Sequence, residues 1–214
     1  MTKQTKKRIG VLVSGGGTNL QALLDAEARG ELKSGTIAVV VASKPGAYAL
    51  ERAAKAGVEG VCVERKAYET REAFEAALQK VLEERQIDVL VLAGFMLVLS
   101  DQFIKLYPDR IINVHPALIP SFCGDGFYGL RVHERALEYG VKVTGATVHF
   151  VNEITDGGAI IMQKAVAIPE GISPEDLQQL VMKEAEHVML PQAAELLCAG
   201  RLSRKGRLVT IDNK

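Results

Sequence analysis

Short runs of apolar, largely β-branched residues recur along the first part of the chain, and segments with helical periodicity separate them. The runs span Arg8–Val13, Thr36–Val41, Gly60–Val63, Asp88–Ala93 and Ile111–Val114. Each run looks continuously buried, which is typical of parallel strands that are covered on both faces. The helical segments span Asn19–Ala28, Ala47–Ala56, Arg71–Arg85 and Ser100–Tyr107. This alternation predicts an α/β fold built on a doubly wound, Rossmann-like and mostly parallel sheet.

The pattern changes after Val114. Thr144–Val151 and Ala159–Ile168 have the composition of two consecutive strands, and the short loop NEITDGG joins them. Such a pair predicts an antiparallel hairpin at the C-terminal edge of the sheet. A long final helix is expected to follow Ser173, which can cap it, with Pro174 at the first helical position.

The length of the chain limits the number of domains. Its 214 residues, 48% of them hydrophobic, are enough for one sizeable core and rather few for two. The sequence shows no internal repeat and no low-complexity linker. We therefore expect residues 1–214 to form a single domain.

Charge and cysteine content narrow the classes of function. The chain has 26 basic and 26 acidic residues and no dense Lys/Arg run, so it lacks the electrostatic footprint of a nucleic-acid or membrane-binding surface. The apolar stretch Ile9–Val13 is too short for a signal peptide or a membrane span. Cys62, Cys123 and Cys198 are odd in number and widely spaced, which fits neither a disulfide framework nor a cysteine zinc site. These features predict a cytoplasmic protein with small-molecule partners; the oligomeric state stays open, with a homodimer as one candidate.

A glycine-rich turn, Ser14-Gly15-Gly16-Gly17-Thr18-Asn19, lies between the first expected strand and the first expected helix. Parallel sheets bind ligands at this edge, and backbone N–H groups at a helix N-terminus attract anions. The dinucleotide fingerprint would need a third glycine where Leu20 stands, and no Lys-Ser/Thr pair completes a P-loop. A phosphomonoester held by Gly17, Thr18 and Asn19 is therefore favoured over NAD or ATP. The alternative is a turn whose glycines serve folding alone.

A second informative stretch is IINVHPALIP, which ends the fifth expected strand. Alternation along a strand puts the side chains of Asn113 and His115 on one face. An amide beside an imidazole could stabilise the oxyanion that forms when a nucleophile adds to a carbonyl, and the imidazole could move a proton. A carboxylate near His115 would raise its pKa and orient it, and Asp156 in NEITDGG is the best candidate. The alternatives are a hydrogen-bonded pair that ends a strand and an aspartate that only shapes a turn.

The other histidines give weaker signals. His149 either supports the site or is a satisfied core residue, whereas His133 and His187 are expected to be structural. No group of His, Cys, Asp and Glu has metal-ligand spacing, so no metal is expected, and no G-x-S-x-G elbow is present.

Four ordered stretches, SGGGTNLQ, VLAGFMLVLS, INVHPALIP and VHFVNEITDGG, resemble the motifs of the phosphoribosylglycinamide formyltransferases of purine biosynthesis. The similarity extends from about Arg8 to about Leu202. The wider formyltransferase family shares the Asn-x-His-Pro strand and the later aspartate. The S-G-x-G-[ST]-N loop is more specific, because it binds the phosphate of the ribonucleotide.

The resemblance implies an enzyme in which Asn113, His115 and Asp156 form the catalytic triad. The amine of 5′-phosphoribosylglycinamide would attack the formyl carbon of the co-substrate 10-formyltetrahydrofolate. His115, kept protonated by Asp156, and the Asn113 amide would stabilise the oxyanion of the tetrahedral intermediate. The proton lost by the amine would return to the leaving folate nitrogen.

The resemblance also implies the binding residues of both substrates. Gly17, Thr18 and Asn19 would bind the phosphate, and Glu186 in KEAEH would contact the ribose hydroxyls. Arg71 corresponds to the arginine that meets the folate. The expected surroundings of the pterin are an apolar wall and backbone groups at Met96, Leu97, Val98 and Leu99, together with Asn113.

The chain departs from the family pattern at three places. Leu97 stands where many members have arginine, so a folate contact there would come from the backbone. Ala117 replaces the serine of the familiar H-P-S-L-L-P. The stretch SFCGDGFYGLRVHE is longer than in compact members and resembles a subset of bacterial sequences, which leaves the closure of this loop and the role of Cys123 open.

Other functions share parts of this sequence pattern. The formyltetrahydrofolate hydrolases have an additional N-terminal regulatory domain and the methionyl-tRNA formyltransferases an additional C-terminal domain, and we expect this chain to have room for neither. The missing third glycine speaks against a nucleotide-binding oxidoreductase. A non-catalytic sugar-phosphate binding module would bind the ribonucleotide and leave the formyl-folate unchanged.

Overall fold

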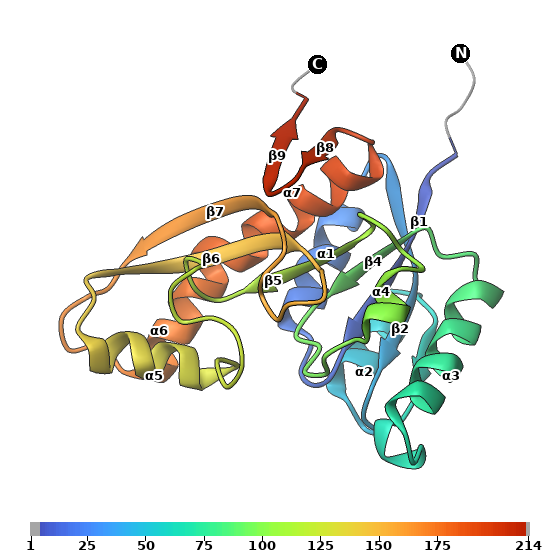
Figure 1. Ribbon diagram of the computed structural model, residues 1–214, viewed down its shortest axis with the longest axis horizontal. Coiled ribbons are helices and arrows are strands. Elements are labelled where there is room, and N and C mark those ends of the chain that lie inside the picture. The colour runs from blue at the N-terminus through green and yellow to red at the C-terminus, as the bar shows by residue number, and fades with distance from the viewer. Residues whose placement is uncertain (1–4, 213–214) are drawn as a thin grey trace.

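A seven-stranded sheet forms the centre of the computed structural model, which describes residues 5–212 (Figure 1). Its strands are, in chain order, β1 (Lys7–Val13), β2 (Gly35–Ala42), β3 (Gly60–Cys62), β4 (Val89–Leu92), β5 (Ile111–His115), β6 (Val143–Phe150) and β7 (Ile160–Ala167). They lie in the order β3-β2-β1-β4-β5-β6-β7. Neighbours among β1 to β5 are parallel, and β6 is antiparallel to both β5 and β7. The predicted doubly wound sheet with an antiparallel hairpin at its edge is confirmed.

The direction in which the sheet grows reverses at β1. This strand pairs with β2 on one side and with β4 on the other. The loops that follow β1 and β4 therefore lead to opposite faces of the sheet and leave a crevice between them. The glycine turn after β1 lies at this crevice.

Helices cover both faces of the sheet (Figure 1). They are α1 (Thr18–Ala28), α2 (Tyr48–Lys55), α3 (Arg71–Glu84), α4 (Asp101–Ile104), α5 (Leu130–Tyr139), α6 (Pro174–Val181) and α7 (His187–Cys198), with a short 3-10 turn η1 (Arg65–Ala67) and a π-helical segment η2 (Met182–Glu186). Apolar side chains of α1, α2, α6 and α7 pack on one face, and those of α3 and α4 pack on the other. Since both faces are covered, a central strand such as β4 is buried at every residue.

Three elements differ from the expectations. β3 is an edge strand with partly exposed side chains, so the expected burial of the run over Gly60–Val63 is wrong for the first three of its residues. The helix expected over Ser100–Tyr107 is shorter, because only α4 forms there. Ser173 caps α6 and Pro174 begins it as expected, but the π-helical segment η2 interrupts the long final helix before α7.

A small hairpin lies outside the main sheet. β8 (Leu202–Lys205) and β9 (Leu208–Ile211) pair antiparallel after α7, at the top of Figure 1. Their side chains are mostly exposed, and Arg204 pairs with Asp109, whose Oδ1 lies 2.7 Å from the arginine Nε. No strand was predicted for residues 202–211, so this hairpin is an addition to the expected fold.

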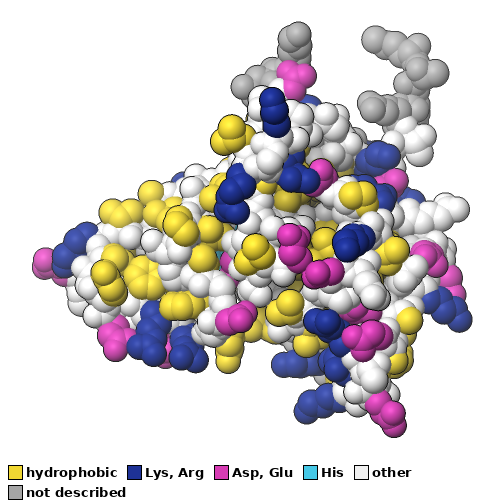
Figure 2. All heavy atoms as spheres, in the orientation of Figure 1, with side chains coloured by type: hydrophobic (Ala, Val, Ile, Leu, Met, Phe, Trp, Pro, Cys, Tyr) yellow, Lys and Arg dark blue, Asp and Glu magenta, His cyan; other side chains and the backbone are white. Residues whose placement is uncertain are grey.

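Acidic and basic side chains are interspersed over the face of the molecule that Figure 2 shows. Within residues 5–212, no helix is long and apolar enough to cross a membrane. Several large apolar side chains are nevertheless exposed, and Met96, Val98, Tyr128 and Ile154 among them border a single cleft.

Candidate active site

The cleft has a volume of about 920 Å³ and lies at the carboxyl ends of the parallel strands. The glycine turn after β1 and the segment η2 line one side of it, next to α1. The loop after β4, which leads to α4 on the other face of the sheet, lines the opposite side. Its size is in the upper range of small-molecule sites.

Asn113, His115 and Asp156 lie together in this cleft. His115 ends β5, and Asn113 lies two residues earlier on the same strand. Asp156 comes from the loop between β6 and β7, and its Oδ2 lies 3.4 Å from Nδ1 of His115. The structure therefore brings together the three side chains that the sequence singled out.

The backbone geometry of the loop between β6 and β7 places Asp156 next to His115. In the antiparallel pair of β5 and β6, Asn113 lies opposite His149, so their side chains share one face of the sheet. The loop approaches this face, with Asp156 in the left-handed region at a φ of 53°. A Cβ atom at Gly158 would overlap the carbonyl oxygen of Phe150, so only glycine fits at this point.

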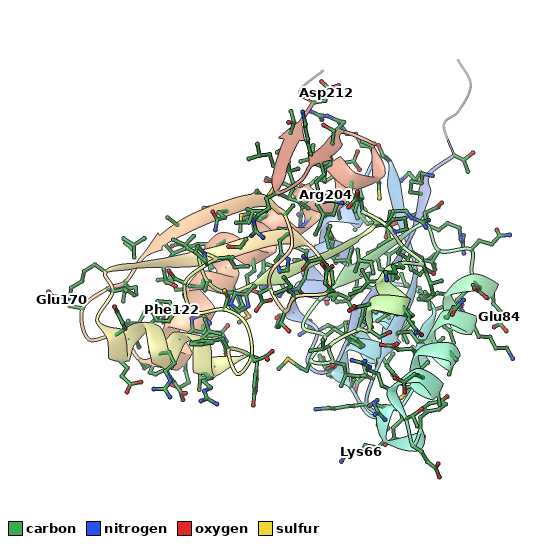
Figure 3. The ribbon with its side chains drawn as sticks, viewed as in Figure 1. Lys66, Glu84, Phe122, Glu170, Arg204 and Asp212 are labelled. Carbon is green, nitrogen blue, oxygen red and sulfur yellow. The ribbon has the colours of Figure 1, made fainter. Side chains whose placement is uncertain are left out.

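Two backbone groups of the loop before α5 complete the contacts of this pair. Nε2 of His115 donates to the carbonyl oxygen of Phe122 at 2.8 Å, and the N–H of Gly124 donates to Oδ2 of Asp156 at 2.9 Å. Phe122 lies beside α5, far from Lys66 and Glu84 at the other side of the molecule (Figure 3). The sequence could not reveal these contacts, because every residue has a carbonyl and nearly every residue has an N–H.

Opposing effects set the pKa values of His115 and Asp156. Burial lowers the pKa of His115 below its ordinary value of 6.5, and the nearby Asp156 and the Phe122 carbonyl only partly offset this. Burial alone would raise the pKa of Asp156, but the neighbouring His149 and His115 and the N–H of Gly124 bring it below its ordinary value. Burial thus opposes the expectation that Asp156 keeps His115 protonated, whereas the acceptors near both ring nitrogens favour it, and the expectation stays a prediction.

His149 belongs to the site, which the sequence had left open. It is buried on β6, and its Nδ1–H donates to the carbonyl oxygen of Phe150 at 2.8 Å. In a neutral ring, Nε2 is then an acceptor, and Nδ2 of Asn113 lies 3.3 Å away. The same Nε2 lies 3.7 Å from Oδ1 of Asp156. His149 therefore determines which way the Asn113 amide points.

The glycine turn leaves the first turn of α1 open toward the cleft. Gly17 is the N-cap of α1 with a φ of 73°, and no side chain caps this helix. A Cβ atom at Gly17 would lie 2.7 Å from Cβ of Ala49, so a side chain there would both strain the backbone and collide with α2. Gly17, Thr18 and Asn19, the residues expected at the phosphate, all line the cleft.

Asn19 and Glu186 connect the glycine turn to the final helical region. Nδ2 of Asn19 donates to Oε2 of Glu186 at 2.7 Å, and both side chains are buried. Burial raises the pKa of Glu186 to about 7, although the Asn19 hydrogen bond acts in the opposite direction. Oδ1 of Asn19 has no hydrogen-bond partner among the described residues. Two residues expected at the ribonucleotide thus form one buried unit.

The residues expected at the folate are only partly brought together. Met96, Leu97, Val98 and Leu99 all line the cleft. Met96 and Val98 are 47% and 58% exposed, whereas Leu97 and Leu99 face the core. Arg71 is absent from the described residues that line the cleft: it begins α3 and has a half-exposed side chain beside Glu72.

His133 also lines the cleft, although it was expected to be structural. It lies on α5, is fully buried, and neither of its ring nitrogens has a hydrogen-bond partner among the described residues. Burial lowers its pKa to about 4, and the nearby His115 adds to this effect. His187 begins α7 outside the cleft lining. Within residues 5–212, no three His, Cys, Asp or Glu side chains are grouped so that they could hold a metal ion.

Known proteins resemble this chain in sequence and structure over almost its whole length. The model of the formyl transferase family matches residues 7–194. The phosphoribosylglycinamide formyltransferase of Escherichia coli is 37% identical over 204 residues, which are 95% of this chain and 93% of that protein. The trifunctional purine biosynthetic protein adenosine-3 of Bos taurus is 42% identical over 205 residues, which are 95% of this chain and 20% of that protein. The crystal structure of glycinamide ribonucleotide transformylase 1 from Symbiobacterium toebii has a TM-score of 0.91 and 42% identity, with 99% of both chains covered.

The chain spans about a fifth of the length of the trifunctional relative, but nearly the full length of the bacterial enzyme. The stretch that the family model matches includes the glycine turn, the end of β5, the loop with Asp156 and the segment η2. The chain belongs to the formyl transferase family, and within it to the phosphoribosylglycinamide formyltransferases.

Proposed function

We propose that the protein transfers the formyl group of 10-formyltetrahydrofolate to the amine of 5′-phosphoribosylglycinamide, a step of de novo purine biosynthesis. The observation that supports this most strongly is the grouping of Asn113, His115 and Asp156 in a cleft whose two sides differ in chemistry. One side offers a helix N-terminus and a buried carboxylate, and the other offers exposed apolar side chains. A phosphorylated sugar suits the first side, and a fused ring system suits the second.

The ribonucleotide fits the side of the cleft next to α1. Its phosphate would accept hydrogen bonds from the backbone N–H groups of Gly17, Thr18 and Asn19, where the helix dipole also favours negative charge. Glu186 would accept hydrogen bonds from the ribose hydroxyls. The unpartnered Oδ1 of Asn19 supports the placement of the ribose next to Glu186. A buried acceptor usually has a donor beside it, and a ribose hydroxyl would be that donor.

The folate fits the side of the cleft after β4. Met96 and Val98 expose apolar side chains there, and contact with a pterin ring would remove this surface from water. Leu97 faces the core, so contacts at that position would use its backbone groups. Arg71 would meet only the part of the folate that extends out of the cleft.

Catalysis would occur where the two substrates meet at the end of β5. The amine nitrogen attacks the formyl carbon, and negative charge develops on the formyl oxygen. Nδ2 of Asn113 has two hydrogens, one of which faces His149, so the other can donate to this oxygen. The developing charge raises the pKa of His115, which takes up the proton that the attacking amine loses, and Asp156 stabilises the imidazolium that forms. The proton lost by the amine then reaches the leaving folate nitrogen.

A spectrophotometric assay with both substrates tests this function. The proposal expects deformylation of the folate only when the ribonucleotide is present, with one tetrahydrofolate formed for each ribonucleotide consumed. Loss of the formyl group without ribonucleotide would instead indicate a hydrolase. Ribonucleotide binding without deformylation would indicate a non-catalytic binding module, and either result would contradict the proposal.

A further inference from the structure

The segment Gly94–Ser100 between β4 and α4, which we name the folate wall, contains no helix or strand. Its backbone groups therefore need hydrogen-bond partners from elsewhere in the fold. Its apolar side chains at Met96 and Val98 are exposed in the cleft. An irregular segment of this kind binds a ligand well only if it is already held in the binding conformation, because ordering it on binding would cost free energy.

Ser14 holds the first part of the folate wall. Its hydroxyl oxygen accepts a hydrogen bond from the N–H of Met96 at 2.9 Å, and its own N–H donates to the carbonyl oxygen of Gly94 at 3.1 Å. The hydroxyl also lies 2.7 Å from that of Ser43, and both serines are buried. Ser14 is the first residue of the glycine turn, so one residue connects the two sides of the cleft.

Glu75 holds the other end of the folate wall. Its carboxylate on α3 accepts hydrogen bonds from both the N–H and the hydroxyl of Ser100, with Oε1 lying 2.7 Å from the backbone nitrogen. The same hydroxyl oxygen accepts from the N–H of Phe103 and so caps α4. The carboxylate is buried, and these bonds supply donors for both of its oxygens.

We propose that Ser14 and Glu75 are positioning residues, which fix the folate wall in its binding conformation and touch neither substrate. This inference rests on the proposed function. Neither side chain belongs to the described residues that line the cleft; Glu75 lies on α3, and Ser14 directly follows β1. Their hydrogen bonds reach the wall at Met96 and Ser100, on either side of the exposed Val98.

The position of Glu75 on α3 supports the same reading. It lies four residues after Arg71, so the two side chains share one face of the helix. One helical face therefore presents both the anchor of the folate wall and the arginine that is expected to meet the folate. A rigid element that carries two such groups favours a preorganised site.

The test compares Glu75→Ala with a matched control, Glu195→Ala. Glu195 on α7 accepts the same pair of hydrogen bonds, from the N–H and the hydroxyl of Ser34 at 2.9 and 2.8 Å, just before β2 at the amino ends of the parallel strands. Glu75→Ala is expected to raise the KM of the formyl-folate and the dissociation constant of tetrahydrofolate about tenfold, with the ribonucleotide KM within about twofold of the original. The control variant is expected to change none of these constants. Calorimetry is the suitable binding assay, since the chain has no tryptophan whose fluorescence could report binding.

Two further variants keep the test decisive if Glu75→Ala folds poorly. Glu75→Gln retains the shape and one acceptor oxygen, and a smaller change in the same folate constants is expected. Ser14→Ala removes the other anchor and should also weaken folate binding, whereas Ser43→Ala leaves the Met96 hydrogen bond in place and should have less effect.

Unchanged folate affinity in folded Glu75 and Ser14 variants would overturn the inference, and so would an equal loss for both substrates. Failure of the proposed function would give a different result from failure of this inference. The unmodified protein would then not transfer the formyl group at all, and the tetrahydrofolate dissociation constants would still decide whether Ser14 and Glu75 position the wall.

Discussion

His115 has a hydrogen-bond acceptor near each ring nitrogen, the Phe122 carbonyl at Nε2 and the Asp156 carboxylate near Nδ1. This geometry suits a protonated ring, whereas burial favours the neutral one and lowers the pKa. Negative charge on the formyl oxygen would shift this balance toward the imidazolium. The site would then stabilise the transition state more than the bound substrates, which is what catalysis requires.

Removing either member of this pair should abolish most of the activity. His115→Ala and Asp156→Asn are expected to lower kcat by about 10²–10⁴, because each removes a group that acts on transition-state charge. Ribonucleotide binding, measured by calorimetry, should be preserved in both. Asp109→Asn is a suitable control, since its partner Arg204 belongs to the outer hairpin. Near-normal turnover of either variant would rule out the mechanism.

His133 should make the protein sensitive to acid. Its pKa of about 4 lies below the ordinary value of 6.5, so the unfolded chain binds a proton more readily than the folded one between these values. This burial should therefore reduce stability as the pH falls from 6.5 to 4, by at most about 3 kcal/mol. His133→Leu should flatten this part of the stability curve, as measured by urea unfolding at several pH values. Parallel curves for both proteins would contradict this account; His187 titrates in both and cancels in the comparison.

The sequence identified the side chains of the site better than their contacts. The Asn-x-His strand and the aspartate of NEITDGG were found because alternation and loop position are visible in the sequence. The carbonyl of Phe122 and the N–H of Gly124 could not be found, because backbone groups carry no sequence signature. His149 was undervalued, since its role depends on the antiparallel register that puts it opposite Asn113.

At the scale of elements, the segment η2 is the least expected feature of the fold. The sequence predicted one continuous helix, yet the hydrogen bonds over Met182–Glu186 are π-helical. Such segments are rare, and they often occur at functional sites because they change the direction of a side chain. Here Glu186 is directed at Asn19 on α1, and this pairing gives the π-helical segment a role at the ribonucleotide side.

Glu186 should make ribonucleotide binding dependent on pH. Burial raises its pKa to about 7, and the ionised carboxylate is the better acceptor for ribose hydroxyls. The dissociation constant of the ribonucleotide is therefore expected to fall as the pH rises from 6 to 8, by up to about tenfold. Glu186→Gln should lack this component and leave the KM of the folate nearly unchanged. Comparing the original protein with Glu186→Gln by calorimetry cancels the titration of the ligand itself. Identical pH profiles of the ribonucleotide dissociation constant would contradict the placement of the ribose at Glu186.

The carboxyl group of Glu186 changes the pH dependence of stability in the opposite direction to His133. Its pKa in the folded protein lies above the ordinary value of 4.5, so its contribution to stability is present below pH 4.5 and lost as the pH rises through about 7. Glu186→Gln should consequently gain stability relative to the original protein above pH 7. Urea unfolding at pH 5 and pH 8 measures this difference.

Strands and helices were predicted well where burial leaves a continuous pattern and poorly where it does not. The inner strands β1, β2, β4 and β5 are apolar because helices cover both of their faces. β3, β8 and β9 lie at an edge or outside the main sheet, so exposure weakens their apolar pattern. The hairpin of β6 and β7 was recognised because two strand-like stretches flank a short loop that ends in Asp156-Gly157-Gly158.

For the molecule as a whole, the reversal of strand order at β1 explains why one cleft can hold two different substrates. The loop after β1 leads to α1 on one face, and the loop after β4 leads to α4 on the other. Each substrate is expected on its own side, with the reacting groups at the end of β5. Ligands of one side should therefore compete only with the substrate of that side.

Inorganic phosphate should compete with the ribonucleotide and not with the folate. The backbone N–H groups of Gly17, Thr18 and Asn19 would bind free phosphate as they bind the phosphomonoester. Calorimetric titration with ribonucleotide at increasing phosphate concentration should show a weakening affinity, while the affinity for tetrahydrofolate stays constant. The experiment uses the unmodified protein, because the structure rules out an informative substitution at Gly17. A side chain there would strain a φ of 73° and collide with Ala49, so Gly17→Val would lose stability whether or not the turn binds an anion.

A substitution at Gly16 is a suitable control for the glycine turn, whereas one at Gly17 is not. A Cβ atom there would meet nothing within 4 Å, so Gly16→Ala should fold normally. If the turn binds phosphate, this variant should still show competition by phosphate, because the N–H groups of the first turn of α1 remain in place. If the glycines serve folding alone, phosphate should leave ribonucleotide affinity unchanged in both proteins. The close packing of Gly17 against Ala49 would then be sufficient reason for a glycine at the N-cap of α1, and the ribonucleotide would have to bind elsewhere.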